Sequence, residues 1–520
     1  MRDIGKMTLE QKIGQLICVR WYNTEEDKKF LFDMLKKGAV GAVQVRNFEG
    51  RDEFIEKIKK AADYPVLICA DMEHGFPGSE LKVPHTMSIS STGSTEYAYE
   101  LARTVAIEAK AKGYNVVWGP VVDIASRGAV CRNPRCLSDD AEVVSDYALS
   151  MIKGYQDEGM IVSAKHYLNP PDILDDTHMK EGLSLMSEKE LLEVVAKPYV
   201  RAIKEGNLTG VMTGHFILDN IDNKYIASLS EKAIGKLREL GFDGLVFTDS
   251  MAMMGIARKY GMKESLGLAI KAGNDIILHT DALNFKQVFE YLMDEYKKGA
   301  FSEERLNDAV SHVLHAQELT LKKATQTRLT DKQINAVKDL SKLALCVETT
   351  DGVELPLKKD SKKLFVLLCE DINDEIDNIG ELQSVNQYSR QNLIVKKELL
   401  EKEFPGCKVL IINEYPYKTE VRRVCYSMAE YDETVFFTFN QTSSYVANDD
   451  VSDRIKYIIN SYEDKVAAVV HMGNPYALEG FKYAPRKFWG TTGGDCEYWA
   501  IKALKGEFKP TGKFPVNLEG

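Results

Sequence analysis

One segment of this sequence carries side chains that could pass protons to and from a reacting atom. Residues 165–178 read KHYLNPPDILDDTH, and the two prolines predict a loop and not a helix. Asp176 and His178 are two residues apart, so their side chains share a side in an extended segment. The carboxylate can then orient the imidazole, and a histidine that titrates near neutrality can both donate and accept a proton. The spacing predicts a general acid–base pair, although an Asp-x-His by itself is more often part of a solvated polar loop.

A candidate nucleophile and further polar residues end the apolar runs of the chain. Asp249 follows GLVFT and precedes small, flexible residues, which suits an attacking carboxylate. Other runs end in Asp71, Asp123, Lys165, His166, His215 and, less clearly, Asp275. The carboxyl ends of parallel barrel strands meet at one face, so we expect these residues to surround a single site. The alternative is that they cap the turns after the strands, as aspartate commonly does.

The elements that must position these residues predict a barrel. Eight apolar runs cover residues 13–20, 40–45, 64–71, 114–124, 161–167, 210–216, 244–250 and 274–280. They are continuous and rich in β-branched residues, as in strands buried on both faces. Helix-like segments alternate with them: residues 95–113 run from a threonine to a glycine, and residues 187–206 open with a Ser-x-x-Glu capping box. We predict an α/β fold with a (β/α)8 TIM-like barrel over residues 1–320.

The rhythm changes after residue 320. A polar, basic stretch and a helix near 331–345 predict a linker over residues 321–350. Strand-like runs then recur at 363–371, 408–415, 433–440 and 465–473, with helical segments between them. Residues 351–520 are therefore predicted to form a smaller α/β sandwich domain. Glu370, Asp371 and the segment TTGGDCEYW at 491–499 are interpreted as structural.

The charge and the cysteines limit the classes of partner and the compartment. The 520 residues include 78 acidic and 67 basic side chains, and the net charge of −11 argues against nucleic acid and against a polybasic membrane anchor. No apolar stretch approaches the length of a membrane-spanning helix. The start MRDIGKMTLEQKIGQL lacks the features of a signal peptide, and the nine dispersed cysteines contain no CxxC. We expect a cytoplasmic protein with reduced thiols; a zinc or disulfide framework is the alternative.

Several segments together resemble glycoside hydrolase family 3, and within it the β-N-acetylglucosaminidase branch. The family loop KHFPGHGDTxxDSH is similar to residues 165–178 at both ends, with the family spacing from Lys165 to His178. The family segment GFDGLVxSDxLxM is similar to residues 241–251 around Asp249. The other similar segments are aPvvDi at 119–124, RSFGxD at 135–140, DQEGG at 71–75, and the closing segments ELPLKK at 354–359 and PTGKFPVNL at 510–518.

The resemblance implies a role for each candidate residue. Asp249 would be the nucleophile, His178 the acid/base and Asp176 its partner, in a retaining reaction that passes through a covalent glycosyl-enzyme. The implied substrate-binding residues are Asp71, Arg135, Lys165, His166 and His215. No metal or organic cofactor is implied. The expected partner is a small carbohydrate, and the second domain is a candidate for homodimer contacts.

Three departures from the family motifs fall on substrate-binding positions. The PGHG of the family loop is LNPP at 168–171, which removes two glycines. No arginine occurs in residues 74–79, and RSF is replaced by Arg135-Cys136-Leu137. The leading interpretation is an exo-β-N-acetylglucosaminidase that hydrolyses terminal β-linked N-acetylhexosamine from small glycosides. The alternatives are another family 3 β-glycosidase, a β-glycoside phosphorylase, or a non-catalytic sugar-binding relic.

Overall fold

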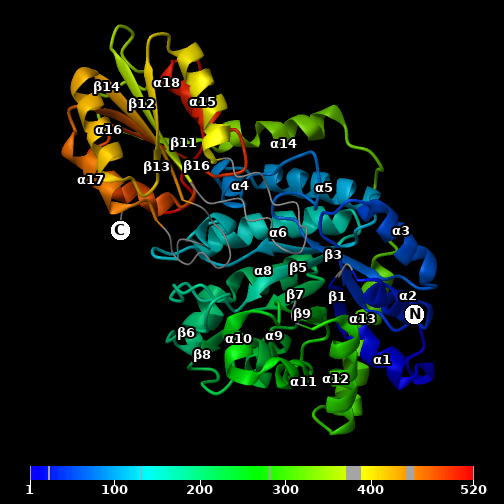
Figure 1. The fold of residues 1–520 in the computed structure, drawn as a ribbon. Coiled ribbons are helices and arrows are strands. Elements are labelled where there is room, and N and C mark those ends of the chain that lie inside the picture. The colour runs from blue at the N-terminus through cyan, green and yellow to red at the C-terminus, as the bar shows by residue number, and fades with distance from the viewer. Residues whose placement is uncertain are drawn as a thin grey trace. The chain divides into compact units, whose positions relative to one another are not determined.

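The computed structural model describes residues 2–20, 24–129, 132–279, 283–370, 388–440 and 450–518. The chain forms two compact units, whose elements are labelled in Figure 1. The first unit comprises Met1–Leu81, Thr95–Ala129 and Cys136–Ala336, and the second comprises Lys82–Ser94, Val130–Arg135 and Val337–Gly520. The predicted boundaries at residues 320 and 350 stay a prediction. The sequence did not predict that two short segments within the first 320 residues belong to the second unit.

The first unit is built on a closed, parallel, eight-stranded barrel. Its strands are β1 (Ile17–Arg20), β2 (Ala42–Gln44), β3 (Leu67–Asp71), β4 (Val116–Val121), β5 (Ile161–Tyr167), β7 (Gly210–Thr213), β9 (Leu245–Thr248) and β10 (Ile277–Leu278). Their order in the sheet is β10-β1-β2-β3-β4-β5-β7-β9. Phe247 of β9 pairs in parallel with Ile276, next to β10, so the two ends of the sheet meet. The predicted barrel is confirmed, and each of the eight apolar runs contains one of its strands.

Helices cover the outside of this barrel (Figure 1). They are α1 (Leu9–Gln15), α2 (Glu25–Lys36), α3 (Arg51–Ala61), α5 (Thr95–Ala111), α6 (Ala141–Asp157), α7 (Glu188–Glu190), α8 (Lys197–Gly206), α9 (Glu231–Glu239), α10 (Met254–Tyr260), α11 (Met262–Ala272), α12 (Phe285–Lys297) and α13 (Glu303–Leu319). Helix α14 (Asp331–Ala344) lies within the predicted linker. A separate two-stranded parallel sheet pairs β6 (Gly182–Ser184) with β8 (Phe216–Leu218).

Two local predictions need correction. The first residues of the run at 13–20 belong to helix α1, because Thr8 and Gln11 form a capping box that starts a helix before the strand. The capping box of Ser187 and Glu190 is confirmed, but residues 187–206 do not form one continuous α-helix. A π-helical turn at Leu191–Val195 precedes α8, whose Pro198 has no N–H to continue the α-helical ladder.

The barrel interior is an apolar core to which all eight strands contribute. Its members include Cys18, Ala42, Leu67, Cys69, Val116, Trp118, Ile161, Met212, Leu245, Phe247, Ile276 and Leu278. The ring of Trp118 meets the ring of Phe247 edge-on, with centroids 6.2 Å apart. The cysteines among the described residues are all free thiols. The core fills the barrel below its carboxyl end, so the polar side chains at the strand ends lie directly above packed apolar side chains.

The second unit contains a six-stranded sheet of order β11-β16-β15-β14-β12-β13. Its strands are β11 (Cys346–Thr349), β12 (Lys363–Cys369), β13 (Lys408–Asn413), β14 (Glu433–Phe439), β15 (Val466–Met472) and β16 (Arg486–Gly490), and its helices are α4 (Met87–Ser91), α15 (Arg390–Glu403), α16 (Lys418–Glu430), α17 (Asp453–Ser461) and α18 (Cys496–Leu504). Neighbouring strands are parallel except for the antiparallel pair of β11 and β16. The four strands predicted from the sequence are confirmed. Strands β11 and β16 were missed because charged residues interrupt their apolar character.

The two early segments of the second unit are held by hydrogen bonds to its later residues. The hydroxyls of Ser88 and Thr491 are hydrogen-bonded, and Lys513 N donates to Ser91 O at 2.8 Å. Asn133 Nδ2 donates to Asn474 Oδ1 at 3.1 Å. These contacts join residues several hundred positions apart, which explains why periodicity along the chain could not reveal them.

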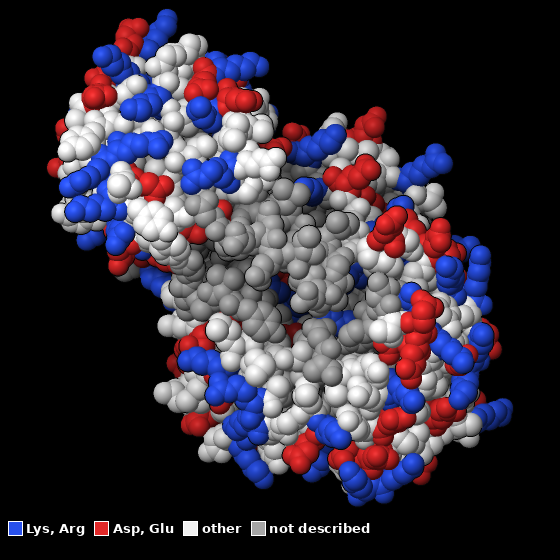
Figure 2. All heavy atoms as spheres, in the orientation of Figure 1, with Lys and Arg blue, Asp and Glu red and all other residues white. Residues whose placement is uncertain are grey.

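The described surface carries both signs of charge. Figure 2 shows acidic and basic side chains interspersed over the visible face of the barrel unit. In the part of the chain that the structure describes, no helix is long and apolar enough to cross a membrane.

Replacing Phe247 with alanine should destabilise the barrel. The Phe247 side chain is fully buried in the core, and truncation of such a phenylalanine costs about 3–5 kcal/mol. Urea unfolding followed by circular dichroism measures the loss. The matched control is Leu321→Ala, because Leu321 is 66% exposed and its truncation should cost less than about 0.5 kcal/mol. Equal losses for the two variants would contradict this description of the core.

Candidate active site

The carboxyl ends of the barrel strands bring most of the predicted site residues to one face of the barrel. Asp71 is the last residue of β3, Lys165 and His166 lie near the end of β5, and Asp249 follows β9 directly. His215 follows β7 by two residues. Because all eight strands run in parallel, these side chains share one end of the barrel.

Asp275 does not belong to this group. The run at 274–280 was expected to carry it at a strand end, but β10 begins at Ile277, so Asp275 precedes its strand. It therefore lies at the opposite, amino end of the barrel.

Asp249 is a partly buried carboxylate surrounded by imidazoles. Its Oδ1 accepts a hydrogen bond from Ser250 N at 2.6 Å, and its Oδ2 lies 3.8 Å from His166 Nε2. Burial by itself raises the pKa of Asp249, but His166, His215, His178 and the hydrogen bond from Ser250 N together outweigh burial and lower this pKa to about 2. Asp249 is therefore ionised throughout the physiological range, as an attacking carboxylate must be.

His178 and Asp176 form the pair that their spacing predicted. Asp176 Oδ1 lies 2.7 Å from His178 Nδ1 and 2.9 Å from the backbone nitrogen of His178. A carboxylate only accepts, so Nδ1 carries a proton and Nε2 is the nitrogen that can exchange a proton with a substrate. The Asp176 side chain is 4% exposed, whereas the His178 side chain is 27% exposed. The carboxylate is thus the buried support and the imidazole the accessible group.

Hydrogen bonds hold the loop that carries this pair. Met254 N, at the start of α10, donates to His178 O at 3.0 Å. Asp172 Oδ2 accepts hydrogen bonds from Ser184 Oγ and Leu185 N, each at 3.0 Å. These contacts fix the loop against the segments that follow β9 and contain β6, so His178 is held on the side of the barrel where Asp249 lies.

His166 is held by two hydrogen bonds to Asp123. Its Nδ1 lies 2.9 Å from Asp123 Oδ2, and its backbone nitrogen donates to Asp123 Oδ1 at 2.8 Å. The peptide bond that precedes His166 is cis. Asn169 Nδ2 donates to the same Asp123 Oδ2 at 2.8 Å. Asp123 thereby orients the ring whose other nitrogen faces Asp249.

Lys165 is a buried cation neutralised by two carboxylates. Its Nζ lies 2.6 Å from Asp71 Oδ1 and 2.9 Å from Glu73 Oε1. The Lys165 side chain is 2% exposed, while that of Asp71 is 56% exposed. Lys165 therefore fixes Asp71, which is the more accessible of the two to a sugar hydroxyl.

His215 is fully buried beneath the site. Its Nε2 donates to Ser250 O at 3.0 Å, and its Nδ1 accepts from Ser228 Oγ at 2.8 Å. Burial lowers the pKa of His215, although the nearby Asp249 carboxylate opposes this shift. Both ring nitrogens are engaged by the protein, so the geometry supports a role in fixing the Asp249–Ser250 turn more than the predicted contact with substrate.

Arg135 is the one predicted site residue that belongs to the second unit. It ends the short 3-10 turn Asn133–Arg135 within the segment Val130–Arg135. Its predicted role in sugar binding stays a prediction.

Three residues of the site had no assigned role in the sequence analysis. Glu73 lies in a segment that resembled a family motif, and an acid beside the predicted lysine was a usable signal. Asn169 replaces a glycine of the family loop, and Ser228 lies far from the other residues in the sequence. Only the folded contacts give the last two residues a place in the site.

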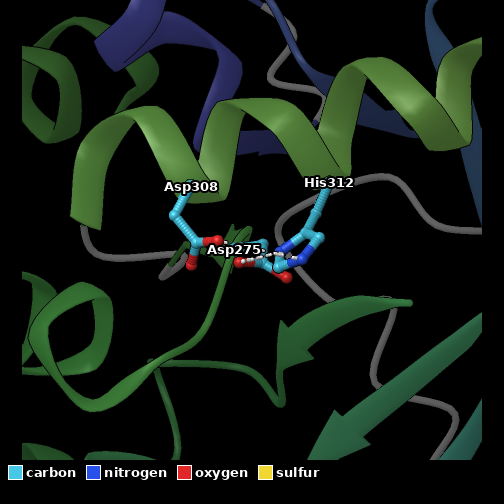
Figure 3. A group of neighbouring side chains, drawn as sticks. All are labelled: Asp275, Asp308 and His312. Atoms are coloured by element: carbon cyan, nitrogen blue, oxygen red, sulfur yellow. Dashed lines mark hydrogen bonds and ion pairs between the residues drawn. The ribbon is translucent and has the colours of Figure 1, made fainter. Parts of the chain in front are cut away.

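A second cluster of ionisable side chains lies at the amino end of the barrel. Figure 3 shows Asp308 and His312 on helix α13 and Asp275 beside them. The three offer oxygen and nitrogen atoms close enough together to bind a cation. However, Asp275 already lies 2.7 Å from Arg305 Nη2 and 3.2 Å from Arg238 Nη2. Two guanidinium groups repel a further cation, so we interpret this cluster as a buried ion-pair network.

A closed parallel barrel with an ionised carboxylate and an Asp–His pair at its carboxyl end is the architecture of a barrel enzyme. The sequence profile of the glycosyl hydrolase family 3 N-terminal domain matches residues 8–316. The chain therefore belongs to glycosyl hydrolase family 3 and is a glycoside hydrolase.

Curated relatives carry related names. A β-N-acetylglucosaminidase/β-glucosidase of Cellulomonas fimi is 30% identical over 334 residues, which cover 60% of this chain and 57% of that enzyme. A β-hexosaminidase of Xylella fastidiosa (strain M23) is 28% identical over 270 residues, covering 48% of this chain and 80% of that enzyme. The matched region thus spans little more than half of the first relative.

Solved structures share the fold over nearly the whole chain. A family 3 β-N-acetylglucosaminidase from Paenibacillus sp. str. FPU-7 superposes with a TM-score of 0.80 at 23% identity, covering 98% of this chain and 99% of that one. A β-glucoside phosphorylase superposes with a TM-score of 0.81 at 23% identity, covering 99% of this chain and 94% of that one. A barrel followed by a smaller α/β domain is therefore common to these proteins.

The lowered pKa of Asp249 predicts a pH dependence of stability. A carboxyl with a folded-state pKa near 2 and an unfolded value near 3.9 stabilises the fold above pH 4 and loses that contribution as the pH falls towards 2. The excess stability of wild type over Asp249→Asn should fall by about 1 kcal/mol between pH 6 and pH 3, measured by urea unfolding. A difference that stays constant between these pH values would contradict the assigned environment.

Breaking the buried network should destabilise the barrel. Asp275→Asn leaves the guanidinium groups of Arg238 and Arg305 without their buried partner, and such losses cost about 3–5 kcal/mol. The matched control is Asp308→Asn, because the Asp308 side chain is 55% exposed and its ion pair should contribute less than about 1 kcal/mol. Thermal unfolding of both variants measures the contrast. A rise of the wild-type melting temperature with added divalent cations would instead support a metal site.

Proposed function

We propose that this family 3 enzyme is a retaining exo-β-N-acetylglucosaminidase that uses Asp249 as nucleophile and His178 as acid/base. The observation that supports it most is the 2.7 Å hydrogen bond between Asp176 and His178, on a loop hydrogen-bonded to the segment that follows the ionised Asp249. The names of the curated relatives support N-acetylhexosamine as the sugar.

In the first step the Asp249 carboxylate attacks the anomeric carbon and forms an ester. The bond between that carbon and the glycosidic oxygen breaks, and His178 Nε2 gives its proton to the departing oxygen. Asp176 accepts from Nδ1–H throughout, which fixes the ring orientation and stabilises the imidazolium before transfer.

In the second step water attacks the anomeric carbon of the glycosyl-enzyme. His178 Nε2 takes a proton from this water, and the bond from the anomeric carbon to the Asp249 oxygen breaks. The sugar leaves with its β configuration and both residues return to their starting states. A neutral imidazole accepts this proton without adding a second negative charge beside the acceptor.

The other residues of the barrel site bind and position. In this proposal Asp71 and His166 bind sugar hydroxyls, and Lys165 holds Asp71 through their ion pair. His215 acts through the Ser250 carbonyl, which keeps the turn at Asp249 fixed.

The free thiols of the described cysteines fit the predicted cytoplasmic location.

The two ion pairs of Lys165 favour hydrolysis over phosphorolysis. Phosphate needs a local excess of positive charge, whereas Lys165 is already paired with two carboxylates. A sugar hydroxyl and a water molecule need no such excess.

Replacing His178 with alanine should give a loss that depends on the leaving group. On a β-N-acetylglucosaminide with a poor leaving group, kcat/KM should fall by about 10²- to 10⁴-fold, since that oxygen needs the proton. On the 2,4-dinitrophenyl glycoside the first step should be little affected, and azide should restore turnover because it attacks without a general base. Asp176→Asn should show the same pattern more weakly.

The first product that the wild-type enzyme releases should be the β-anomer of the sugar, and proton NMR measures which anomer appears first. Release of the α-anomer, or an equal loss for good and poor leaving groups in His178→Ala, would reject the proposed roles. Faster turnover with added phosphate and a sugar 1-phosphate product would identify a phosphorylase instead.

A further inference from the structure

Near the start of the loop that carries the acid/base, this chain has an asparagine where the family motif has a glycine. Asn169 lies between His166 and the two prolines Pro170 and Pro171 and is 9% exposed. Its backbone nitrogen donates to His166 O at 2.7 Å, so residues 166–169 form a tight turn. The Asn169 side chain is thereby directed back towards the strand that it has just left.

The side chain of Asn169 reaches the carboxylate that grips His166. Asn169 Nδ2 and His166 Nδ1 both point at Asp123 Oδ2, at 2.8 Å and 2.9 Å, while His166 N occupies Asp123 Oδ1. Asp123 is 3% exposed. A buried carboxylate needs several donors, and hydrogen bonds to a charged acceptor are stronger than those between neutral groups.

His166 in turn faces the reacting carboxylate. Its Nε2 lies 3.8 Å from Asp249 Oδ2, and its side chain is 13% exposed. A change in the rotation of the Asp123 carboxylate therefore moves the ring that stands beside Asp249.

We infer that Asn169 is a positioning residue that holds Asp123, and through it His166, in the orientation that serves Asp249. The inference rests on the proposed role of Asp249. The family motif has a glycine at this position. A glycine has no side chain, so it cannot donate the hydrogen bond that Asn169 donates to Asp123.

Removal of the Asn169 amide should slow the attack by Asp249 and should not affect protonation of the leaving oxygen. In Asn169→Ala the kcat/KM should fall about tenfold, the size expected for a lost hydrogen bond to a charged group. The fall should be equal for a 2,4-dinitrophenyl and a 4-methylphenyl β-N-acetylglucosaminide, because His166 does not protonate the leaving oxygen. It should appear in kcat, because His166 faces the reacting carboxylate; a change in KM alone would reflect only the proposed contact of His166 with the sugar.

The matched control is Ser126→Ala. Ser126 Oγ donates to Pro171 O at 2.7 Å, so this variant removes a hydrogen bond of the same loop and leaves the donors from His166 and Asn169 to Asp123 in place. It should change kcat/KM by less than about threefold. In a His166→Ala background, Asn169→Ala should cause no further loss on the 2,4-dinitrophenyl substrate, since neighbours that act through one group are not additive.

Three outcomes would overturn the inference: the same loss in Ser126→Ala, a loss confined to the poorer leaving group, or a full tenfold loss in the His166→Ala background. If wild type cleaves no aryl β-N-acetylglucosaminide, the proposed sugar specificity fails. The positioning role of Asn169 can then be tested without substrate, by measuring the NMR chemical shift of the His166 Nδ1 proton. Asn169→Ala should shift that signal and Ser126→Ala should not, and an unchanged signal in Asn169→Ala would reject it.

Discussion

All eight strands of the barrel run in one direction and close into a ring, and the position of every site residue at a strand end follows from this arrangement. The pairing of Phe247 with Ile276 joins the last strands, so the carboxyl ends of β3, β5, β7 and β9 share one end of the barrel. Residues that are far apart in the sequence, such as Asp71 and Asp249, thereby come to the same face. The apolar core beneath them supports their backbone positions and keeps water out of the interior.

Charge compensation is the second organising feature of the site. Lys165 is paired with Asp71 and Glu73, and the ring of His166 stands between the carboxylates of Asp123 and Asp249. Each buried ionisable group thus has a partner of complementary charge or a hydrogen-bond donor, which burial requires. Such a site suits an uncharged, hydroxyl-rich substrate and leaves a carboxylate and an imidazole as its reactive groups.

Much of this could be read from the sequence because it depends on local patterns. The buried parallel strands appear as continuous apolar runs, and the Asp176–His178 pair depends on a spacing of two residues. Asp275 was misplaced because a run of residues does not show where inside it the strand begins. The support of Asp123 by Asn169, and the inclusion of residues 82–94 in the second unit, depend on contacts between distant segments that have no periodic signal.

The central claim is that Asp249 forms a bond to the sugar, and trapping that bond tests it most directly. A 5-fluoro-β-N-acetylglucosaminyl fluoride slows the second step of a retaining reaction more than the first, so the glycosyl-enzyme should accumulate. Mass spectrometry of the intact protein should then show one added sugar, and peptide mapping should place it on Asp249. Attachment to another carboxylate, or steady release of sugar without any covalent adduct, would contradict the account.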